Sequence, residues 1–156
     1  MKAVLQRVSY AACRVDGEIT GECKNGLLVL LGVGKEDTEE DARLLAEKIC
    51  KCRIFCDDND KMNFSVCDID GEMLVISNFT LLANYAHGNR PDYMNAKKPD
   101  EANKLYEYFC ELVSQKVKRI GRGVFGAEMH IETQLMGPVT IVMDSEVLKM
   151  PKSQRK

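Results

Sequence analysis

A continuous apolar run, Leu27-Leu28-Val29-Leu30-Leu31, follows the turn pair Asn25-Gly26 and decides the fold class. A strand that is apolar at every position predicts burial on both faces, as in a sheet that other layers cover. Residues 3–8 predict an earlier strand, and Asp16-Gly17 predicts a tight hairpin, because both central turn positions must tolerate a positive φ. The start of the chain is therefore predicted to build a packed sheet.

Two amphipathic helices are predicted after this run. The first is predicted to begin at Thr38, with acidic residues in its first turn, and to place Ala42, Leu45, Ala46 and Ile49 on one apolar stripe. The second is predicted to begin near Pro99, to keep apolar residues at helical spacing and to end at Gly121.

Further strands are predicted at residues 53–55, 73–82, 125–133 and 139–143. A chain with two main helices cannot cover both faces of a large parallel sheet. The predicted fold class is therefore α/β: a single domain with two packed, barrel-like β-sheet layers and two main helices on one side. The domain is predicted to span residues 1–156, of which 145–156 form a mobile basic tail.

Composition excludes several classes of protein. The 156 residues are 45% hydrophobic and 29% charged, which argues against disorder, and the net charge of −2 argues against a bulk-basic nucleic-acid coat protein. An 18-residue apolar run and a charged-then-apolar leader are both missing, so we expect a cytoplasmic protein without membrane association.

The seven cysteines are an odd number, which favours reduced thiols over a disulfide framework. Cys50, Cys52 and Cys56 cluster, but this spacing lacks the second Cys or His pair of a zinc site. We expect neither a metal nor a cofactor.

The sequence carries few of the usual catalytic groups. It has two histidines, His87 in a loop and His130 on the exposed side of a strand, and no nucleophile-elbow, P-loop or dinucleotide motif. An enzyme built this way depends on backbone donors and on groups of its own substrate.

Two segments differ from ordinary strand sequence. Ser77-Asn78-Phe79-Thr80-Leu81 places polar groups within an apolar strand, and Gly137-Pro138 directly precedes another strand. By itself, the first segment fits an ordinary sheet edge as well as it fits a functional motif. The second by itself fits an ordinary trans turn, since only about 5–6% of X–Pro bonds are cis.

Taken together, these segments resemble the D-aminoacyl-tRNA deacylase family over residues 1–145. The resemblance includes the opening residues 1–8, the runs 26–33, 37–42, 45–49 and 53–55, and the segments 61–63, 88–91 and 124–129. The family's two motifs read Ser-Gln-Phe-Thr and Gly-Pro-Val-Thr; here the second is intact at 137–140. The chain departs from the family at Asn78, which replaces Gln, and at Met136, where Asp is common.

The resemblance implies an enzyme that hydrolyses the ester of D-aminoacyl-tRNA, and of glycyl-tRNA, as proofreading in translation. It implies catalytic roles for Ser77, Phe79 and Thr80, with the backbone N–H groups of Phe79 and Thr80 facing the oxyanion. The residues that it implies for substrate binding and chiral selection are Arg7, Asn78, Met129, Gly137 and Pro138.

The resemblance also implies the partners. They are the aminoacylated 3′ end of tRNA and a second copy of the chain, with active sites at the subunit interface and a Gly-cisPro segment contributed by the partner; DNA is not expected. Basic residues at Lys116, Lys118, Arg119 and Arg122 fit contact with RNA or a solvated helix end equally. The alternatives are an L-specific editing domain of similar fold and an inactive homologue that binds the tRNA end.

Overall fold

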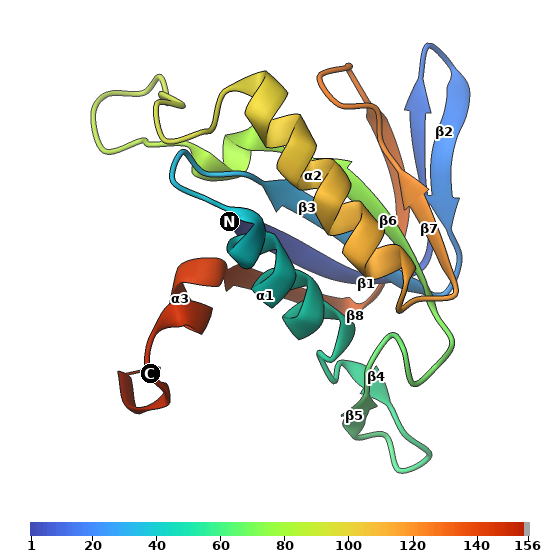
Figure 1. Cartoon of the computed structure of the whole chain (residues 1–156). Coiled ribbons are helices and arrows are strands. Elements are labelled where there is room, and N and C mark those ends of the chain that lie inside the picture. The colour runs from blue at the N-terminus through green and yellow to red at the C-terminus, as the bar shows by residue number, and fades with distance from the viewer. Residues whose placement is uncertain (155–156) are drawn as a thin grey trace.

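The computed structural model describes residues 1–154. Arg155 and Lys156, which we expected in the basic tail, lie outside the described residues. The chain alternates strands and helices (Figure 1). Its elements are β1 (Lys2–Val15), β2 (Glu18–Cys23), β3 (Gly26–Gly32), α1 (Glu39–Cys50), β4 (Phe55–Cys56), β5 (Met62–Phe64), β6 (Glu72–Ser77), the 3-10 turn η1 (Phe79–Leu82), α2 (Pro99–Ser114), β7 (Arg119–Arg122), β8 (His130–Asp144), α3 (Ser145–Lys149) and η2 (Lys152–Gln154).

One curved sheet contains six of these strands. Along one edge, β1 pairs first with β3 and then with β2, and along its other edge it pairs antiparallel with β8. Parallel pairing then joins β3 to β6 and β6 to β7. The sheet nearly closes where β2 meets β7, because a Cβ at Gly21 would lie 2.4 Å from the carbonyl oxygen of Arg122. Only glycine permits that approach of two backbones.

The curvature gives the sheet two apolar faces, each with its own core. Leu27, Val29 and Leu31 of β3 point towards α1 and α2, which pack together over one face (Figure 1). Leu28, with Leu30 packed beside it, belongs to a second core enclosed by the curled sheet. The prediction that this strand is buried on both faces is confirmed.

The predicted fold class is confirmed, and its two sheet layers belong to one curved, barrel-like sheet. The Asp16-Gly17 hairpin is also confirmed, with φ of 51° and 84° at its two turn residues. Both main helices begin as predicted, α1 after Thr38 and α2 at Pro99.

Several predicted boundaries are wrong. The strand expected at 73–82 ends at Ser77, because Asn78 caps the turn η1. The helix expected to reach Gly121 ends at Ser114, and Gly121 lies inside β7, whose backbone pairs with β6. Residues 125–129 precede β8 as a loop, because Gly126 has a φ of 76°. Of the strand expected at 53–55, only Phe55 belongs to β4.

The segment expected to be a mobile tail begins with the helix α3 at residues 145–149, and its mobility stays a prediction. The backbone N–H of Ser145 donates to the carbonyl oxygen of Met1 at 2.8 Å, and Ser145 is buried. Lys149 forms an ion pair with Asp41 of α1 at 2.6 Å. These contacts join α3 to the start of the chain and to α1.

Candidate active site

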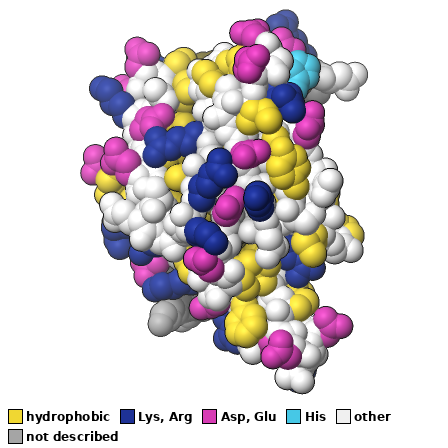
Figure 2. All heavy atoms as spheres, turned by 90° about the vertical axis from the view of Figure 1, so that its right-hand side faces the viewer, with side chains coloured by type: hydrophobic (Ala, Val, Ile, Leu, Met, Phe, Trp, Pro, Cys, Tyr) yellow, Lys and Arg dark blue, Asp and Glu magenta, His cyan; other side chains and the backbone are white. Residues whose placement is uncertain are grey.

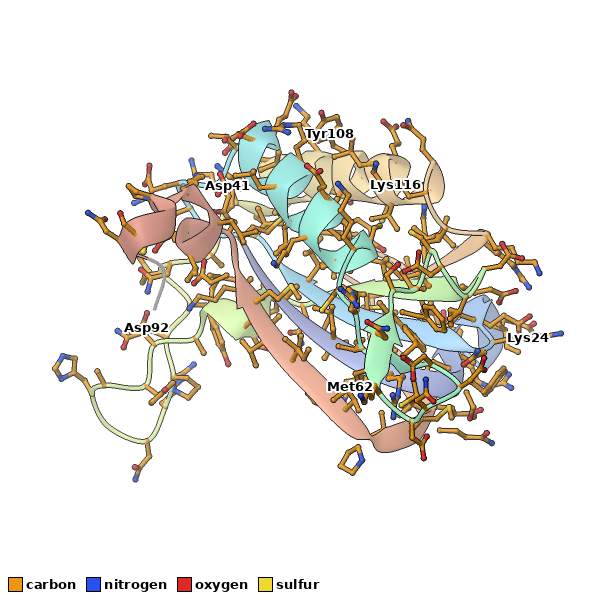
Figure 3. All side chains as sticks on the ribbon, turned by 90° about the horizontal axis from the view of Figure 1, so that it is seen from below. Lys24, Asp41, Met62, Asp92, Tyr108 and Lys116 are labelled. Carbon is orange, nitrogen blue, oxygen red and sulfur yellow. The ribbon has the colours of Figure 1, made fainter. Side chains whose placement is uncertain are left out.

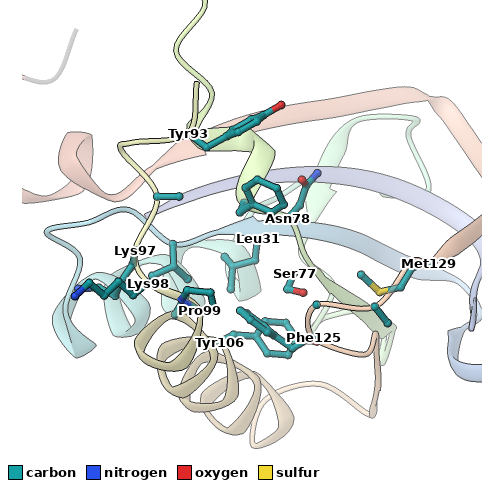
Figure 4. A pocket seen from close by; sticks show the side chains of 16 residues that line it. Leu31, Ser77, Asn78, Tyr93, Lys97, Lys98, Pro99, Tyr106, Phe125 and Met129 are labelled. Carbon is teal, nitrogen blue, oxygen red and sulfur yellow. The ribbon is translucent and has the colours of Figure 1, made fainter. Parts of the chain in front are cut away.

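A pocket of about 540 Å³ lies where β3 and β6 end, beside the first turns of α2 (Figure 4). In a parallel arrangement, the carboxyl ends of neighbouring strands open to the same side, which is where α/β proteins bind ligands. The lining residues come from β3, the motif after β6, α2 and the loop before β8; they are Leu31, Val33, Ser77, Asn78, Phe79, Tyr93, Ala96, Lys97, Lys98, Pro99, Ala102, Tyr106, Phe125, Gly126, Ala127 and Met129.

The first motif forms one wall of this pocket. Backbone pairing continues just past β6, since the N–H of Asn78 donates to the carbonyl oxygen of Leu31 at 2.8 Å. The chain then turns into η1, whose N-cap is Asn78. Its side-chain oxygen accepts the backbone N–H of Thr80 at 3.2 Å and also the Thr80 hydroxyl. Of the two backbone donors expected at the oxyanion, the one on Thr80 is therefore occupied.

The backbone N–H of Phe79 has no hydrogen-bond partner among the described residues. It begins a 3-10 turn, where the first N–H groups have no acceptor within the turn. Phe79 itself is 58% exposed, and its ring meets Tyr93 edge-on with centroids 4.9 Å apart. An unpaired donor at the rim of an apolar pocket fits the binding of a carbonyl oxygen or an oxyanion.

The described lining residues include no carboxylate, imidazole or thiol. Tyr106 donates its hydroxyl to the carbonyl oxygen of Val75 at 2.9 Å, and burial raises the pKa of Tyr106 far above its ordinary value. Lys97 donates to the carbonyl oxygen of Lys35 at 2.7 Å. Tyr106 is thus no base at neutral pH, and the Lys97 ammonium is already engaged.

The second motif interrupts the pairing between β1 and β8. Gln6 lies opposite Thr140 and Val8 opposite Leu135, so a bulge of four residues in β8 faces Arg7 alone. The Gly137–Pro138 bond within this bulge is cis, as predicted, and Gly137 has a φ of 124°. Both residues are exposed.

Arg7 anchors this bulge through hydrogen bonds from its guanidinium. Its Nε donates to the carbonyl oxygen of Met136 at 3.3 Å, and its Nη1 donates to the carbonyl oxygen of Ile54 at 2.8 Å. The guanidinium thereby ties β8 to the chain segment before β4. A planar fork of donors suits two fixed acceptors better than a flexible ammonium does.

The two motifs do not meet within one chain. Of the predicted site residues, Ser77, Asn78, Phe79 and Met129 line the pocket, and Thr80 follows them in η1. Arg7 and residues 134–140 are not among the described residues that line the pocket. The roles that we expect for all of these residues stay predictions.

Several lining residues escaped the sequence reasoning. Tyr106 and Ala102 read only as the apolar stripe of a helix, and Leu31 only as strand core. Phe125 and Tyr93 carried a usable signal, since both lie in or beside segments that resemble the family, but no role was assigned to them.

The basic residues at 116–122 are largely neutralised by acids from elsewhere in the chain. Lys118 pairs with Asp70 at 3.1 Å, Arg119 with Glu22 at 3.4 Å and Arg122 with Glu107 at 2.7 Å. Figure 2 shows acidic and basic side chains interspersed over the side of the molecule where β2 and β7 lie. This surface is therefore mixed in charge, which favours a solvated surface over an RNA-binding patch.

The seven cysteines are free thiols, and four of them are buried. Burial raises the pKa of the Cys50 thiol to about 12, and the neighbouring Cys67 thiol contributes to the same shift. Cys50 and Cys56, which lie close together in the sequence, have different neighbours in the structure. Cys50 contacts Cys67, whereas Cys56 contacts Arg7 at 3.8 Å. Within residues 1–154, no group of three or more Cys, His, Asp or Glu could hold a metal ion, and no helix is long and apolar enough to cross a membrane.

The comparisons with known proteins agree with one another. The family model described as D-Tyr-tRNA(Tyr) deacylase matches residues 4–144. The chain is 50% identical to the D-aminoacyl-tRNA deacylase of Anaeromyxobacter dehalogenans, with 95% of this chain and 99% of that protein covered. The deacylase of Alkaliphilus metalliredigens is also 50% identical, with 94% and 98% covered.

Two solved structures share the fold. The c-Myc DNA Unwinding Element Binding Protein superimposes with a TM-score of 0.87 at 37% identity, covering 92% of this chain and 98% of its own. A probable eukaryotic D-amino acid tRNA deacylase gives 0.79 at 15% identity, covering 91% and 97%, and that likeness concerns the fold alone. Matched over almost its whole length by the family model and by relatives at half identity, the chain belongs to the D-Tyr-tRNA(Tyr) deacylase family.

Proposed function

We propose that this protein hydrolyses the ester bond of D-aminoacyl-tRNA to release free tRNA and the D-amino acid, as chiral proofreading in translation. The observation that carries the proposal is the unpaired Phe79 N–H at the rim of the apolar pocket, in a chain half identical to curated deacylases. Such a donor is already oriented before the reaction begins, which is the usual source of oxyanion stabilisation in acyl transfer.

The proposed reaction is attack of water on the ester carbonyl. The C–O bond to the terminal ribose breaks, the developing oxyanion accepts from Phe79, and the ribose oxygen leaves with a proton. Because the described pocket offers no carboxylate or imidazole, we assign proton transfer to the neighbouring ribose hydroxyl of the substrate. Ser77 and Met129 shape the wall against which the aminoacyl end lies.

Chiral selection is assigned to the bulge at Gly137–Pro138 of a second copy. The bulge is exposed and lies outside the pocket of its own chain, so it serves the site only if it enters the pocket of a partner. A rigid wall there would collide with an L side chain and leave room for a D side chain. Glycine lacks a side chain, so glycyl-tRNA is a second proposed substrate.

The proposed homodimer places β8 at the interface. The outer edge of β8 is unpaired within the described chain, and Leu135, Met136 and Val142 are 46%, 42% and 73% exposed. Exposed apolar side chains along a free strand edge are typical of surfaces that associate. Sedimentation should give twice the mass of one chain, and an active monomer would contradict the proposal.

The decisive experiment compares hydrolysis of D-tyrosyl-tRNA, L-tyrosyl-tRNA and glycyl-tRNA under single-turnover conditions. We expect cleavage of the D-tyrosyl and glycyl esters and survival of the L-tyrosyl ester. Preferential cleavage of the L ester would indicate an L-specific editing domain. Binding of tRNA without hydrolysis of any of the three would indicate an inactive homologue.

A further inference from the structure

A finger-like loop, residues 83–98, projects from the molecule between η1 and α2 (Figures 1 and 3). Its neck is closed by Asn84 and Asp92, whose backbones exchange two hydrogen bonds of 2.9 Å. The Asn84 side-chain amide also donates to the Asp92 carboxylate at 3.0 Å, which accepts the Met94 N–H as well. Hydrogen bonds therefore hold the finger together at its neck, where its acidic residue, Asp92, is already engaged.

The tip of the finger, residues 85–91, combines an exposed aromatic ring with cationic and imidazole groups. Tyr85 is 81% exposed, and His87 and Arg90 are exposed too. No acid occurs between 85 and 91, and among the described residues Arg90 has no ion-pair partner. This contrasts with Lys118, Arg119 and Arg122, which acids of the same chain neutralise.

Both ends of the finger are anchored at the candidate active site. It leaves η1, which carries Phe79 and Thr80, and returns through Tyr93 to Pro99 at the start of α2. Tyr93 and Pro99 line the pocket, and the Tyr93 ring packs against Phe79. A polynucleotide whose last nucleoside enters the pocket therefore has the finger at the pocket rim.

We propose that the finger tip binds the unpaired nucleotides that precede the terminal adenosine of the tRNA, with bases stacked on Tyr85 and on the Arg90 guanidinium. This inference rests on the proposed function. Single-stranded bases are recognised by stacking on aromatic rings and guanidinium planes, and the adjacent phosphates favour a cation without an acidic neighbour. Tyr85 and Arg90 are thus binding residues that extend recognition beyond the ester and its ribose.

The test compares two substrates that carry the same ester. One is D-tyrosyl-tRNA. The other is the D-tyrosyl ester of adenosine alone, which lacks the preceding nucleotides that the finger is proposed to bind. For Tyr85→Ala and Arg90→Ala, we expect the ratio of kcat/KM for the tRNA to kcat/KM for the adenosine ester to fall about tenfold, as loss of one stacked base predicts. Tyr85→Phe keeps the ring and should keep the ratio.

The matched control is Lys24→Ala, which removes a charge at the opposite end of the molecule (Figure 3) and should leave the ratio unchanged. An unchanged ratio in Tyr85→Ala would overturn the inference, as would conversion of this variant from dimer to monomer, because a second copy would then cover the finger. If the unmodified protein cleaves neither ester, the proposed function fails.

A binding measurement tests the finger by itself. Affinity for a short single-stranded RNA ending in CCA should drop about tenfold in Tyr85→Ala and stay level in Tyr85→Phe. Equal affinity in all three proteins would overturn the inference whatever the hydrolysis results.

Discussion

The side-chain oxygen of Asn78 accepts hydrogen bonds from both the backbone N–H and the hydroxyl of Thr80. One amide oxygen thereby caps η1 and occupies both donors of Thr80. The Phe79 N–H, by contrast, has no partner among the described residues and lies at the pocket rim. We infer that Asn78 acts here through the turn that it holds.

Substitutions of Asn78 should separate capping from charge. Asn78→Ser keeps a neutral cap and should keep most of the activity, whereas Asn78→Ala should lower the free energy of unfolding by about 1 kcal/mol through loss of the cap. Asn78→Ala should also lower kcat about tenfold, less than the 10²–10³-fold cost of deleting an oxyanion donor, because a loosened turn misplaces Phe79. Urea denaturation and single-turnover hydrolysis provide the two measurements.

Asn78→Asp serves as the companion variant, because a carboxylate caps as well as an amide but carries a negative charge. We expect normal stability with reduced kcat, since the charge opposes the developing oxyanion. Full activity in Asn78→Asp would argue against an oxyanion beside this turn.

The Thr80 hydroxyl should prove dispensable. It donates to an amide oxygen, which is too weak a base to activate a nucleophile, and the described pocket holds no carboxylate or imidazole to replace it. Thr80→Val, which keeps the shape of the side chain, should retain kcat within about tenfold. A loss of several orders of magnitude with unchanged stability would make the hydroxyl a nucleophile or an essential positioning group.

The substrate provides the complementary test of the same chemistry. A D-tyrosyl-tRNA that ends in 2′-deoxyadenosine lacks the hydroxyl beside the ester, so we expect slow hydrolysis at unchanged binding. Cleavage of this substrate at the normal rate would contradict assistance by the ribose hydroxyl.

Arg7 should affect selectivity more than rate. Its guanidinium joins the carbonyl oxygens of Met136 and Ile54, and Arg7→Lys cannot hold two acceptors with one fixed fork. We expect the ratio of kcat/KM for D- over L-tyrosyl-tRNA to fall about tenfold, as loss of one positioning contact of about 1.4 kcal/mol predicts. Parallel assays with both esters measure the ratio.

Arg14→Lys is the matched control, because Arg14 lies on the same strand and pairs with Glu132 of β8 far from the bulge. It should leave the ratio unchanged. An equal fall in both variants would assign the effect to general loosening of the β1–β8 pairing.

Features whose signal lies in adjacent residues were predicted correctly from the sequence, whereas features that depend on a side-chain cap or on distant partners were not. The run at Leu27–Leu31 and the pair Asp16-Gly17 carry their structures in adjacent residues, so both were predicted. The end of β6 was missed because it depends on a side-chain cap by Asn78 that apolar periodicity does not report. The acidic partners of Lys118 and Arg119 lie 48 and 97 residues away in the sequence, and that of Arg122 lies 15 residues away on α2. The mixed charge of that surface therefore became visible only in three dimensions.

The buried carboxylate of Asp41 joins α1 to α3. Its Oδ1 accepts from the Ser145 hydroxyl at 2.7 Å and from Lys149 at 2.6 Å, and its Oδ2 accepts the Thr38 N–H at 2.9 Å. Burial alone would raise the pKa of Asp41, but the hydrogen bonds from Lys149, Ser145 and Thr38 outweigh it and hold the pKa well below its ordinary value.

This environment predicts a specific pH dependence of stability. A carboxylate with a depressed pKa in the folded state contributes stability above its unfolded pKa of about 3.9 and loses it as the pH falls towards the folded value. Asp41→Asn should therefore lower the free energy of unfolding at pH 7 by about 1.5–3 kcal/mol, the worth of hydrogen bonds to a charged group. The difference between the two proteins should shrink as the pH falls from about 5 to about 3.

Urea titrations at a series of pH values measure this difference. The contributions of the other carboxylates cancel, because both proteins contain them. Glu40→Gln, which breaks the exposed ion pair with Arg43 on the same helix, should lower the free energy of unfolding by at most about 1 kcal/mol. A gap that stays constant down to about pH 3 would mean that the charge of Asp41 contributes nothing to the docking of α3.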